Sequence, residues 1–575
     1  MPGLLRNVPV SDDQRRANDR HNLWVVAAVL VLLFLYLYLF TYAADWFDWP
    51  RPRELARDWG VNIAHVFDGD GNVDSVLNIT LTQRFDHNDD ERLVLFLLLA
   101  GAFLSAYFLP LPAKQPALIV WTGLAVLILY GFRATAGLLW CQLWVYLILH
   151  PRWEKYGALI LGCGLLGYFA VLAPLAGSDW AVAGFLLALS CLGAYLGYRF
   201  LFLPLLRRPA AAAMLRTAAV QSAILTVGLG ALVEGWQGRS WSLPLGVLLF
   251  FWQWERLIMY HVDYKDGQVP QEIPLWRFLA VFWNPGVLPN WNWGVTIGQG
   301  YAYVHNNFLC EDKNKLVLDG VKILLIALLY LLFWNWVRHL LVDFFTGLGV
   351  PVYRAFTREM VRHFMRGEEI GTASVLATTF LDLTRWTMLW AGVVHFKVGI
   401  WRICGYRMDP YINKPWLATD LATFWSRFTF HYREFLVRAF YYPVFFRCFR
   451  KRPYLRVFVA TMAAAAFGNL VWGHVTERLY YRGLEWEHVV YVLGTWPYFV
   501  LLGIGIALSQ IYLLKFRRRR RPWTLDRWLW KDVLAAYCML QFYALIHIFA
   551  RPAAGSTTWD LTRLFLRGFG IQLTG

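Results

Sequence analysis

Apolar residues along the chain gather into runs of about twenty, and short polar loops separate the runs. A helix of about twenty apolar residues crosses the hydrocarbon core of a bilayer, which is about 30 Å thick. The pattern predicts membrane-spanning helices at 23–43, 93–112, 116–132, 135–150, 156–175, 181–204, 217–234, 242–259, 318–341, 375–400, 455–477, 489–514 and 533–549. The predicted fold is therefore an all-α polytopic membrane protein with about 11–13 transmembrane helices.

The composition supports this prediction and narrows the class of partner. Of the 575 residues, 58% are hydrophobic and 16% are charged, whereas a soluble chain carries about a quarter charged residues. The net charge of +17 does not indicate a nucleic-acid partner, because basic residues gather in short loops between the apolar runs, at 207–208, 450–452 and 515–521. Such clusters mark the cytoplasmic side, where they face anionic headgroups, so membrane lipid is the expected partner.

The basic residues also set the expected topology. Arg15, Arg16 and Arg20 place the N-terminus in the cytoplasm, and alternation from there places the acidic loop 44–92 outside. The first apolar run is too long for a signal-peptide core, so we expect a retained helix. The basic segment 354–366 would also fall outside, which favours a re-entrant or interfacial amphipathic element at that point.

A metal site is not expected from the sequence. The seven cysteines are scattered, with neither a paired framework nor a CxxC spacing. The segment 68–79 begins like a calcium-binding loop, but Val73 and Ile79 stand where that loop needs glycine and glutamate. A solvated turn is the expected structure there.

Polar residues close to the apolar runs are concentrated in two regions, about 242–310 and 385–477, and polar groups between spans mark functional sites. Several segments of these regions follow a known order: 243–253 (LPLGVLLFFWQ), 259–267 (MYHVDYKDG), 399–407 (GIWRICGYR), 413–420 (NKPWLATD) and 424–427 (FWSR), continued by Pro443 and Thr461. Together they resemble the membrane-bound O-acyltransferase (MBOAT) family, in its branch of bacterial alginate O-acetyltransferases and D-alanyl transferases.

The resemblance covers about residues 240–480 and implies three regions: an N-terminal transmembrane scaffold at 1–240 with the extracytoplasmic loop 44–92, an MBOAT-like core at 241–480, and C-terminal transmembrane helices at 481–575. It implies helices around a central tunnel in the bacterial inner membrane. The implied activity moves a short acyl group, acetyl in this branch, from an acyl-CoA or acyl-carrier thioester to a hydroxyl of an extracytoplasmic glycan or envelope polymer. No tightly bound cofactor is implied, and a periplasmic or carrier protein is an implied partner.

The chain departs from the family at the catalytic pair. The family's histidine in its WHG motif falls on Asn469, and the aspartate of its SGYSD motif falls on His395. Three alternatives follow: His395 is the general base with Asn469 as its partner, His474 is the catalytic histidine, or the site is inactive. The second requires a local change of the helix, because five residues of α-helix turn about 500°, which places His474 about 140° away from Asn469.

Each of these polar residues also has a structural explanation. His395 can hydrogen-bond Lys397 or a neighbouring backbone carbonyl, Asn469 can join two helices, and His474 can pair with Glu477.

Three basic residues of the core are candidates for donor binding. The resemblance and their charge predict that Arg427, assisted by Lys414 and Arg407, binds the phosphates of a coenzyme A donor. The alternative for these residues is ordinary positive charge at the cytoplasmic face. For the whole chain, the alternative to an enzyme is a catalytically inactive MBOAT-fold scaffold or subunit of a cell-envelope export or modification complex.

Overall fold

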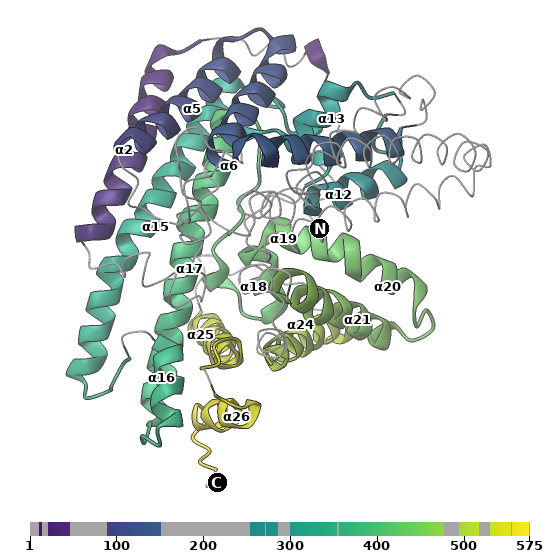
Figure 1. Ribbon diagram of the computed structural model, residues 1–575. Coiled ribbons are helices and arrows are strands. Elements are labelled where there is room, and N and C mark those ends of the chain that lie inside the picture. Colours follow the sequence, from purple (N-terminus) through teal and green to yellow (C-terminus); the bar gives the residue numbers. More distant parts are fainter. Residues whose placement is uncertain are drawn as a thin grey trace, which may run out of the picture. The chain divides into compact units, whose positions relative to one another are not determined.

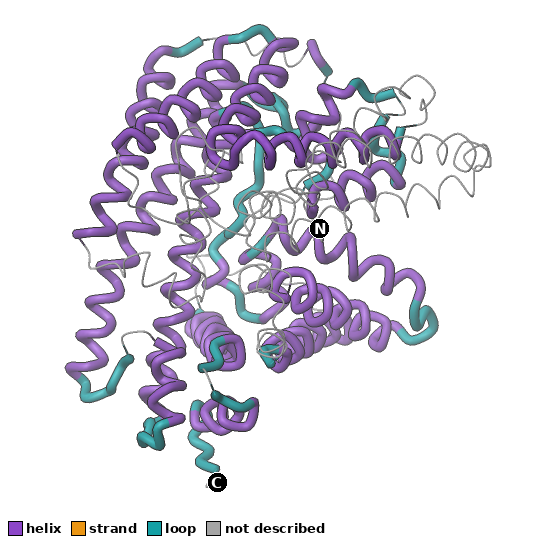
Figure 2. Tube along the Cα trace, viewed as in Figure 1, coloured by secondary structure: helices purple, strands orange, loops and turns teal. Residues whose placement is uncertain are grey.

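The computed structural model describes residues 11–13, 21–46, 89–150, 254–270, 272–285, 299–353, 356–475, 494–516, 529–553 and 555–573. In these ranges the chain is helical and forms no β-strand, apart from an isolated antiparallel bridge between Phe308 and Tyr406 (Figures 1 and 2). The prediction of an all-α fold is confirmed for this part. Several predicted features lie outside the described residues: most of the loop 44–92 with its segment 68–79, the spans between 156 and 234, the segment 243–253, and the basic residues at 207–208 and 517–521.

Contacts within the chain divide it into two compact units. The first unit comprises Met1–Thr41, Pro50–Gly320 and Ile400–Met408, and the second comprises Tyr42–Trp49, Val321–Gly399 and Asp409–Gly575. The unit boundaries fall inside two long helices, α15 (Lys313–Gly347) and α17 (Thr372–Ile403).

The first unit is built mainly from six further helices. These are α2 (Leu23–Trp46), α5 (Asp89–Phe108), α6 (Leu111–Leu149), α12 (Trp254–Lys265), α13 (Leu275–Phe282) and α14 (Tyr301–Asn306). The two spans predicted at 116–132 and 135–150 are one continuous helix, α6, so the predicted break between them is wrong. The connecting residues Tyr130–Ala134 contain one glycine but no proline or turn pair, and a single glycine costs a helix only about 1 kcal/mol.

The second unit continues the helical pattern. Its elements are α16 (Phe356–Met365), η6 (Pro415–Leu417), α18 (Leu421–Phe428), α19 (Phe430–Leu436), the π-helix η7 (Val437–Tyr441), α20 (Tyr442–Arg447), α21 (Pro453–Thr461), the π-helix η8 (Met462–Val475), α24 (Trp496–Phe516), α25 (Trp530–Ile546), η10 (His547–Ala550) and α26 (Thr558–Arg567). The segment predicted as amphipathic forms α16, which buries Phe356, Met360, Val361 and Phe364 on one side. Its amphipathic character is confirmed.

Two of the described helices are long and apolar enough to cross a membrane, at Trp496–Phe516 and Trp530–Ala550. They coincide with the spans predicted at 489–514 and 533–549. Two such helices support the membrane prediction only modestly, because core helices of soluble proteins can have the same length and composition.

Two buried lysines close the carbonyl end of α5 in the first unit. Lys114 donates from Nζ to the carbonyl oxygens of Ala106 (2.8 Å) and Tyr107 (3.1 Å). Lys313 donates to the same Tyr107 carbonyl (3.1 Å), and its Nζ lies 4.4 Å from the centre of the Tyr107 ring. The last carbonyls of a helix lack partners within it and carry the negative end of its dipole, so both ammonium groups stabilise this end.

A buried arginine performs the same function for α13. Arg256 of α12 is almost fully buried and donates from one terminal nitrogen to the carbonyls of Val281 (3.3 Å) and Phe282 (3.1 Å). Its guanidinium carbon also lies 5.4 Å from the centre of the Trp401 ring. These contacts join α12, α13 and the end of α17 within the first unit.

We expect Arg256→Met to destabilise the protein by about 2–4 kcal/mol, because it leaves two buried carbonyls without a charged donor. Arg277→Met is the matched control, since Arg277 lies on α13 itself, is only partly buried and contacts Trp276, which is 38% exposed. That control should cost less than about 1 kcal/mol. Thermal unfolding of the purified protein, followed by helical circular dichroism, measures both. Equal losses of stability in the two variants would contradict the role of Arg256 as the donor that stabilises the end of α13.

A buried carboxylate joins α12 to the start of α14. The Oδ2 atom of Asp263 accepts a hydrogen bond from the backbone nitrogen of Ala302 at 3.0 Å. The contact leaves no room for a side chain at Gly300: a Cβ there would lie 2.2 Å from that oxygen and 2.7 Å from the Met259 carbonyl oxygen. Gly300 is therefore required by close packing.

Candidate functional site

His395 lies on α17 in the second unit and is buried. Its Nδ1 atom is 2.7 Å from the carbonyl oxygen of Ala391, one turn earlier on the same helix. A carbonyl only accepts, so Nδ1 carries the hydrogen and the lone pair of the neutral ring is on Nε2. The predicted bond to a neighbouring carbonyl is present, and it fixes the ring in the form that a general base needs.

A line of aromatic rings leads from His395 to the surface of the second unit. The ring centre of Tyr330, on α15, lies 5.4 Å from that of His395 and 6.0 Å from that of Trp416, on η6. Trp416 is 38% exposed. Sequence reasoning missed both residues, although Tyr330 is the single tyrosine of the predicted span 318–341 and Trp416 belongs to the segment 413–420.

Two of the predicted donor-binding residues meet beside Trp416. The backbone nitrogen of Asn413 donates to the Arg427 carbonyl at 2.7 Å, and the Arg427 guanidinium donates to the Lys414 carbonyl at 3.4 Å. Lys414 has a positive φ of 48°, which is uncommon for a residue other than glycine and accompanies the turn into η6. Partial burial lowers the pKa of the Arg427 guanidinium from its ordinary value, though arginine stays charged in proteins.

The helix that carries Arg427 has a well-defined start. The Oδ1 atom of Asp420 accepts from the Thr423 backbone nitrogen at 2.9 Å, and its Oδ2 atom accepts from the Thr423 hydroxyl at 2.7 Å. This N-cap satisfies a backbone donor that the helix itself cannot, and fixes the first turn of α18. Arg427 in the last turn of α18 is thereby held over the Lys414 turn.

Asn469 lies on η8 and accepts a hydrogen bond at its Oδ1 from the Tyr432 hydroxyl of α19, at 3.2 Å. The predicted helix-joining role of Asn469 is therefore present. With Oδ1 occupied in this way, Nδ2 is the group of Asn469 that can donate to a reacting oxygen.

The π-helical backbone of η8 corrects the predicted relation between positions 469 and 474. Hydrogen bonds in a π-helix join residue i to residue i+5, so positions five apart lie nearly one above the other. The expected separation of about 140° assumed an α-helix and is wrong for this segment. Positions 469 and 474 share a face without a kink at a glycine. The side chain of His474, and all of Glu477, lie outside the described residues.

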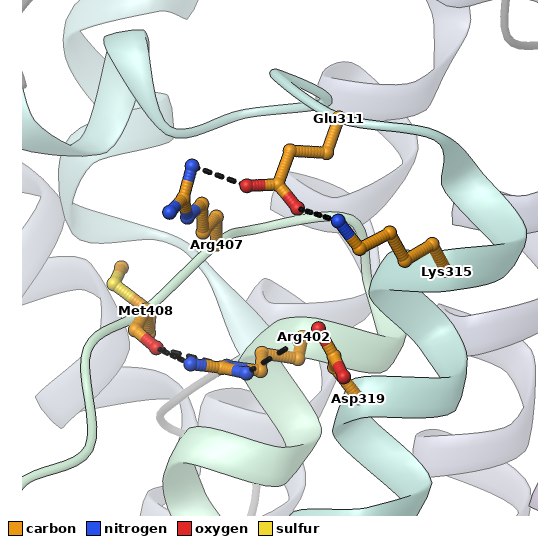
Figure 3. A network of polar contacts seen from close by, with 6 residues as sticks. All are labelled: Glu311, Lys315, Asp319, Arg402, Arg407 and Met408. Carbon is orange, nitrogen blue, oxygen red and sulfur yellow. Dashed lines mark hydrogen bonds and ion pairs between the residues drawn. The ribbon is translucent and has the colours of Figure 1, made fainter.

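Arg407, the third predicted donor-binding residue, belongs to the first unit and is part of a polar network (Figure 3). Its guanidinium forms an ion pair with Glu311, whose other carboxylate oxygen lies 3.6 Å from Nζ of Lys315. The backbone nitrogen of Arg407 also donates to the Asn307 carbonyl at 2.8 Å. Arg407 thus has a structural partner, which weakens the case for a role in donor binding.

A second arginine completes this network. Arg402 donates from Nε (2.9 Å) and a terminal nitrogen (2.6 Å) to the Met408 carbonyl, and its other terminal nitrogen lies 4.0 Å from an Asp319 carboxylate oxygen (Figure 3). Arg402 on α17 and Arg407 in the loop after it thus hold the first part of this loop beside the start of α15. This geometry explains why the segment 399–407 carries two arginines.

Comparison with models of known protein families gives no match, and no curated protein matches the chain. Within the described ranges, no three His, Cys, Asp or Glu side chains gather closely enough to hold a metal ion. The MBOAT resemblance therefore stays a prediction that rests on the segments quoted above.

Proposed function

We propose that this protein is a membrane-bound O-acyltransferase that moves a short acyl group, acetyl, from a thioester donor to a hydroxyl of an extracytoplasmic glycan or envelope polymer. The observation that carries the proposal is the contact of Tyr330 with both His395 and Trp416. It links the candidate base to the turn at Lys414, to whose carbonyl Arg427 of α18 donates, so residues with two complementary roles lie along one path in the second unit.

The proposed setting is the bacterial inner membrane, with the N-terminus in the cytoplasm. The apolar runs and the two long apolar helices support it, and the proposed architecture is about 11–13 transmembrane helices around a central tunnel. A buried polar side chain such as that of His395 is costly in this setting, which favours a functional role.

In the proposed reaction, Nε2 of His395 takes the proton of the acceptor hydroxyl while the hydroxyl oxygen attacks the thioester carbonyl carbon. The tetrahedral oxyanion collapses, the carbon–sulfur bond breaks, and the departing thiolate takes the proton from His395. Asn469, through Nδ2, is the candidate donor to the oxyanion. Lys414 and Arg427 bind the anionic part of the donor, and no metal or tightly bound cofactor takes part.

The experiment measures transfer and hydrolysis of labelled acetyl-CoA by the purified full-length chain. We expect turnover by the wild type, and Arg427→Ala should raise KM for the donor about 10–100-fold with little change in kcat, because it removes a charge-assisted contact. Arg362→Ala is the matched control, since it removes an equal charge from the exposed side of α16.

Two outcomes would count against this proposal. No turnover by folded wild-type protein with acetyl-CoA or an acetylated carrier would favour the inactive scaffold, which the asparagine at the family's usual histidine position also suggests. An unchanged KM in Arg427→Ala would remove this residue from donor binding and leave ordinary positive charge as its explanation.

A further inference from the structure

Helices α20 and α21 of the second unit form a hairpin (Figure 1), and the sequence at the end of this hairpin is unusually basic. The last residue of α20, Arg447, and the loop residues Arg450, Lys451 and Arg452 place four cations within six residues. From 435 to 475 the chain has no aspartate or glutamate, so no acidic residue near in sequence balances them. Within the part of the chain that the structure describes, none of the four side chains pairs with a carboxylate.

Exposed aromatic rings alternate with these cations. Phe446 is 56% exposed, Phe449 is 47% exposed and Tyr454 is 47% exposed. The residues from Phe446 to Tyr454, named here the hairpin tip, are all exposed except Cys448. Large apolar side chains beside basic ones are typical of a surface that inserts at the headgroup level of a membrane.

The hairpin tip has a defined conformation. Arg450 donates from Nε to the Phe446 carbonyl at 2.9 Å, so this hydrogen bond does not use its two terminal nitrogens. Arg456 lies over the Phe445 ring, 3.7 Å from its centre, and donates to the Phe445 carbonyl. Phe449 holds a positive φ of 49°, and the backbone nitrogen of Arg452 donates to its carbonyl at 2.9 Å. A bulky residue keeps such a φ only where surrounding contacts fix it.

We propose that the hairpin tip is a binding site for the headgroup of an anionic phospholipid. The phosphate receives hydrogen bonds from Arg450 and its basic neighbours, and the rings of Phe446 and Phe449 enter the upper part of the acyl layer. Charge complementarity requires an anion, and the exposed rings select a lipid over a soluble acidic partner. The inference rests on the membrane setting of the proposed function but does not depend on acyl transfer.

The test titrates full-length protein in uncharged detergent with dioctanoyl phosphatidylglycerol and, separately, with dioctanoyl phosphatidylcholine, by microscale thermophoresis. We expect tighter binding of phosphatidylglycerol, and a loss of about thirtyfold in the double variant Arg450→Gln with Arg452→Gln. The matched control is Arg362→Gln with Arg366→Gln, which removes two exposed cations, one on α16 and one directly after its end, near Glu359 and Glu368 in the sequence. It should change the affinity less than about threefold.

A second variant tests the aromatic part of the hairpin tip. Phe446→Ser with Phe449→Ser should weaken binding of both lipids about tenfold, since it removes apolar area that enters the acyl layer. Binding of phosphatidylglycerol should also fall as salt rises from about 0.05 to 0.5 M. Circular dichroism of each variant shows whether it folds. The salt series uses the wild type alone, so its result does not depend on the folding of any variant.

Three results would overturn the inference. Equal losses of phosphatidylglycerol affinity in the arginine variants of the hairpin tip and of the control would mean that general surface charge causes the binding. Glycerol 1-phosphate binding as tightly as phosphatidylglycerol would mean a site for free phosphate. The third result has two parts: the protein binds both lipids equally, and it binds polyglutamate equally well with and without the two serine substitutions. This result would mean an acidic protein partner. Failure of acetyl-CoA turnover would leave this inference in place, so the two proposals fail separately.

Discussion

Replacing His395 by alanine is expected to lower the rate of acetyl transfer by about 10²–10⁴-fold, the usual contribution of a positioned general base. The bond from Nδ1 to the Ala391 carbonyl holds the lone pair on Nε2, and alanine removes both groups. The measurement is kcat for labelled acetyl-CoA with purified full-length protein, normalised to the folded fraction. Asn469→Ala should cost less, about 10–10³-fold, because it removes one donor to the oxyanion.

His431→Gln is the matched control for His395. His431 is also buried in the second unit and its Nε2 atom lies 2.9 Å from a backbone carbonyl oxygen, that of Asp409. Its lone pair is thus on Nδ1, and we expect a change in stability but not in kcat per folded molecule. If His474→Ala loses activity and His395→Ala does not, His474 is the catalytic histidine instead. Full activity in all three variants of the candidate site would remove the site assignment.

Replacing Gly300 by alanine is expected to destabilise the protein by about 3–5 kcal/mol. The added Cβ would lie 2.2 Å from the Asp263 Oδ2 atom and 2.7 Å from the Met259 carbonyl oxygen. The carboxylate must move away, which breaks its bond to the Ala302 backbone nitrogen and leaves buried polar groups without their partners. Chemical unfolding of the detergent-solubilised protein gives the free energy change.

Gly123→Ala provides the control for this effect. Gly123 lies inside α6, and a Cβ there would meet only the Trp283 ring at 3.8 Å, an ordinary contact. Alanine inside a helix gains about 0.5–1 kcal/mol over glycine, so this variant should be neutral or more stable. A Gly300→Ala variant as stable as wild type would show that α12 and α14 can separate at no cost.

The sequence predicts the helices well where apolar runs end at clear signals. The run at 533–549 and helix α25 with η10 agree, because charged and polar residues bound it on both sides. Prediction failed at α6, because the glycine and arginine near position 131 interrupt the apolar run as a loop would. A single glycine nevertheless reduces the stability of a helix only slightly. It also failed at 462–475, since the π-helical backbone of η8 depends on packing against neighbouring helices and not on residue periodicity.

The candidate site was predicted only in part, for a similar reason. His395, Lys414 and Arg427 are visible in the sequence as polar residues at marked positions. The role of Tyr330 is not visible in the sequence. Nothing about a tyrosine in a leucine-rich run indicates which residues, 65 or more positions away, it contacts. Arg407 shows the reverse case: its charge suggested a ligand, and its pairing with Glu311 depends on a loop path that no local pattern encodes.

In the proposed membrane setting, the length of α6 limits how this protein can sit in a bilayer. Its 39 residues follow a helical path of about 58 Å, roughly twice the thickness of the hydrocarbon layer. A straight helix of this length would extend about 44 Å along the membrane normal even at a tilt of 40°, near the upper limit for spanning helices. In that setting, at least one end of an α6 that crosses the bilayer, near Pro112 or near His150, would therefore stand in the aqueous or headgroup phase.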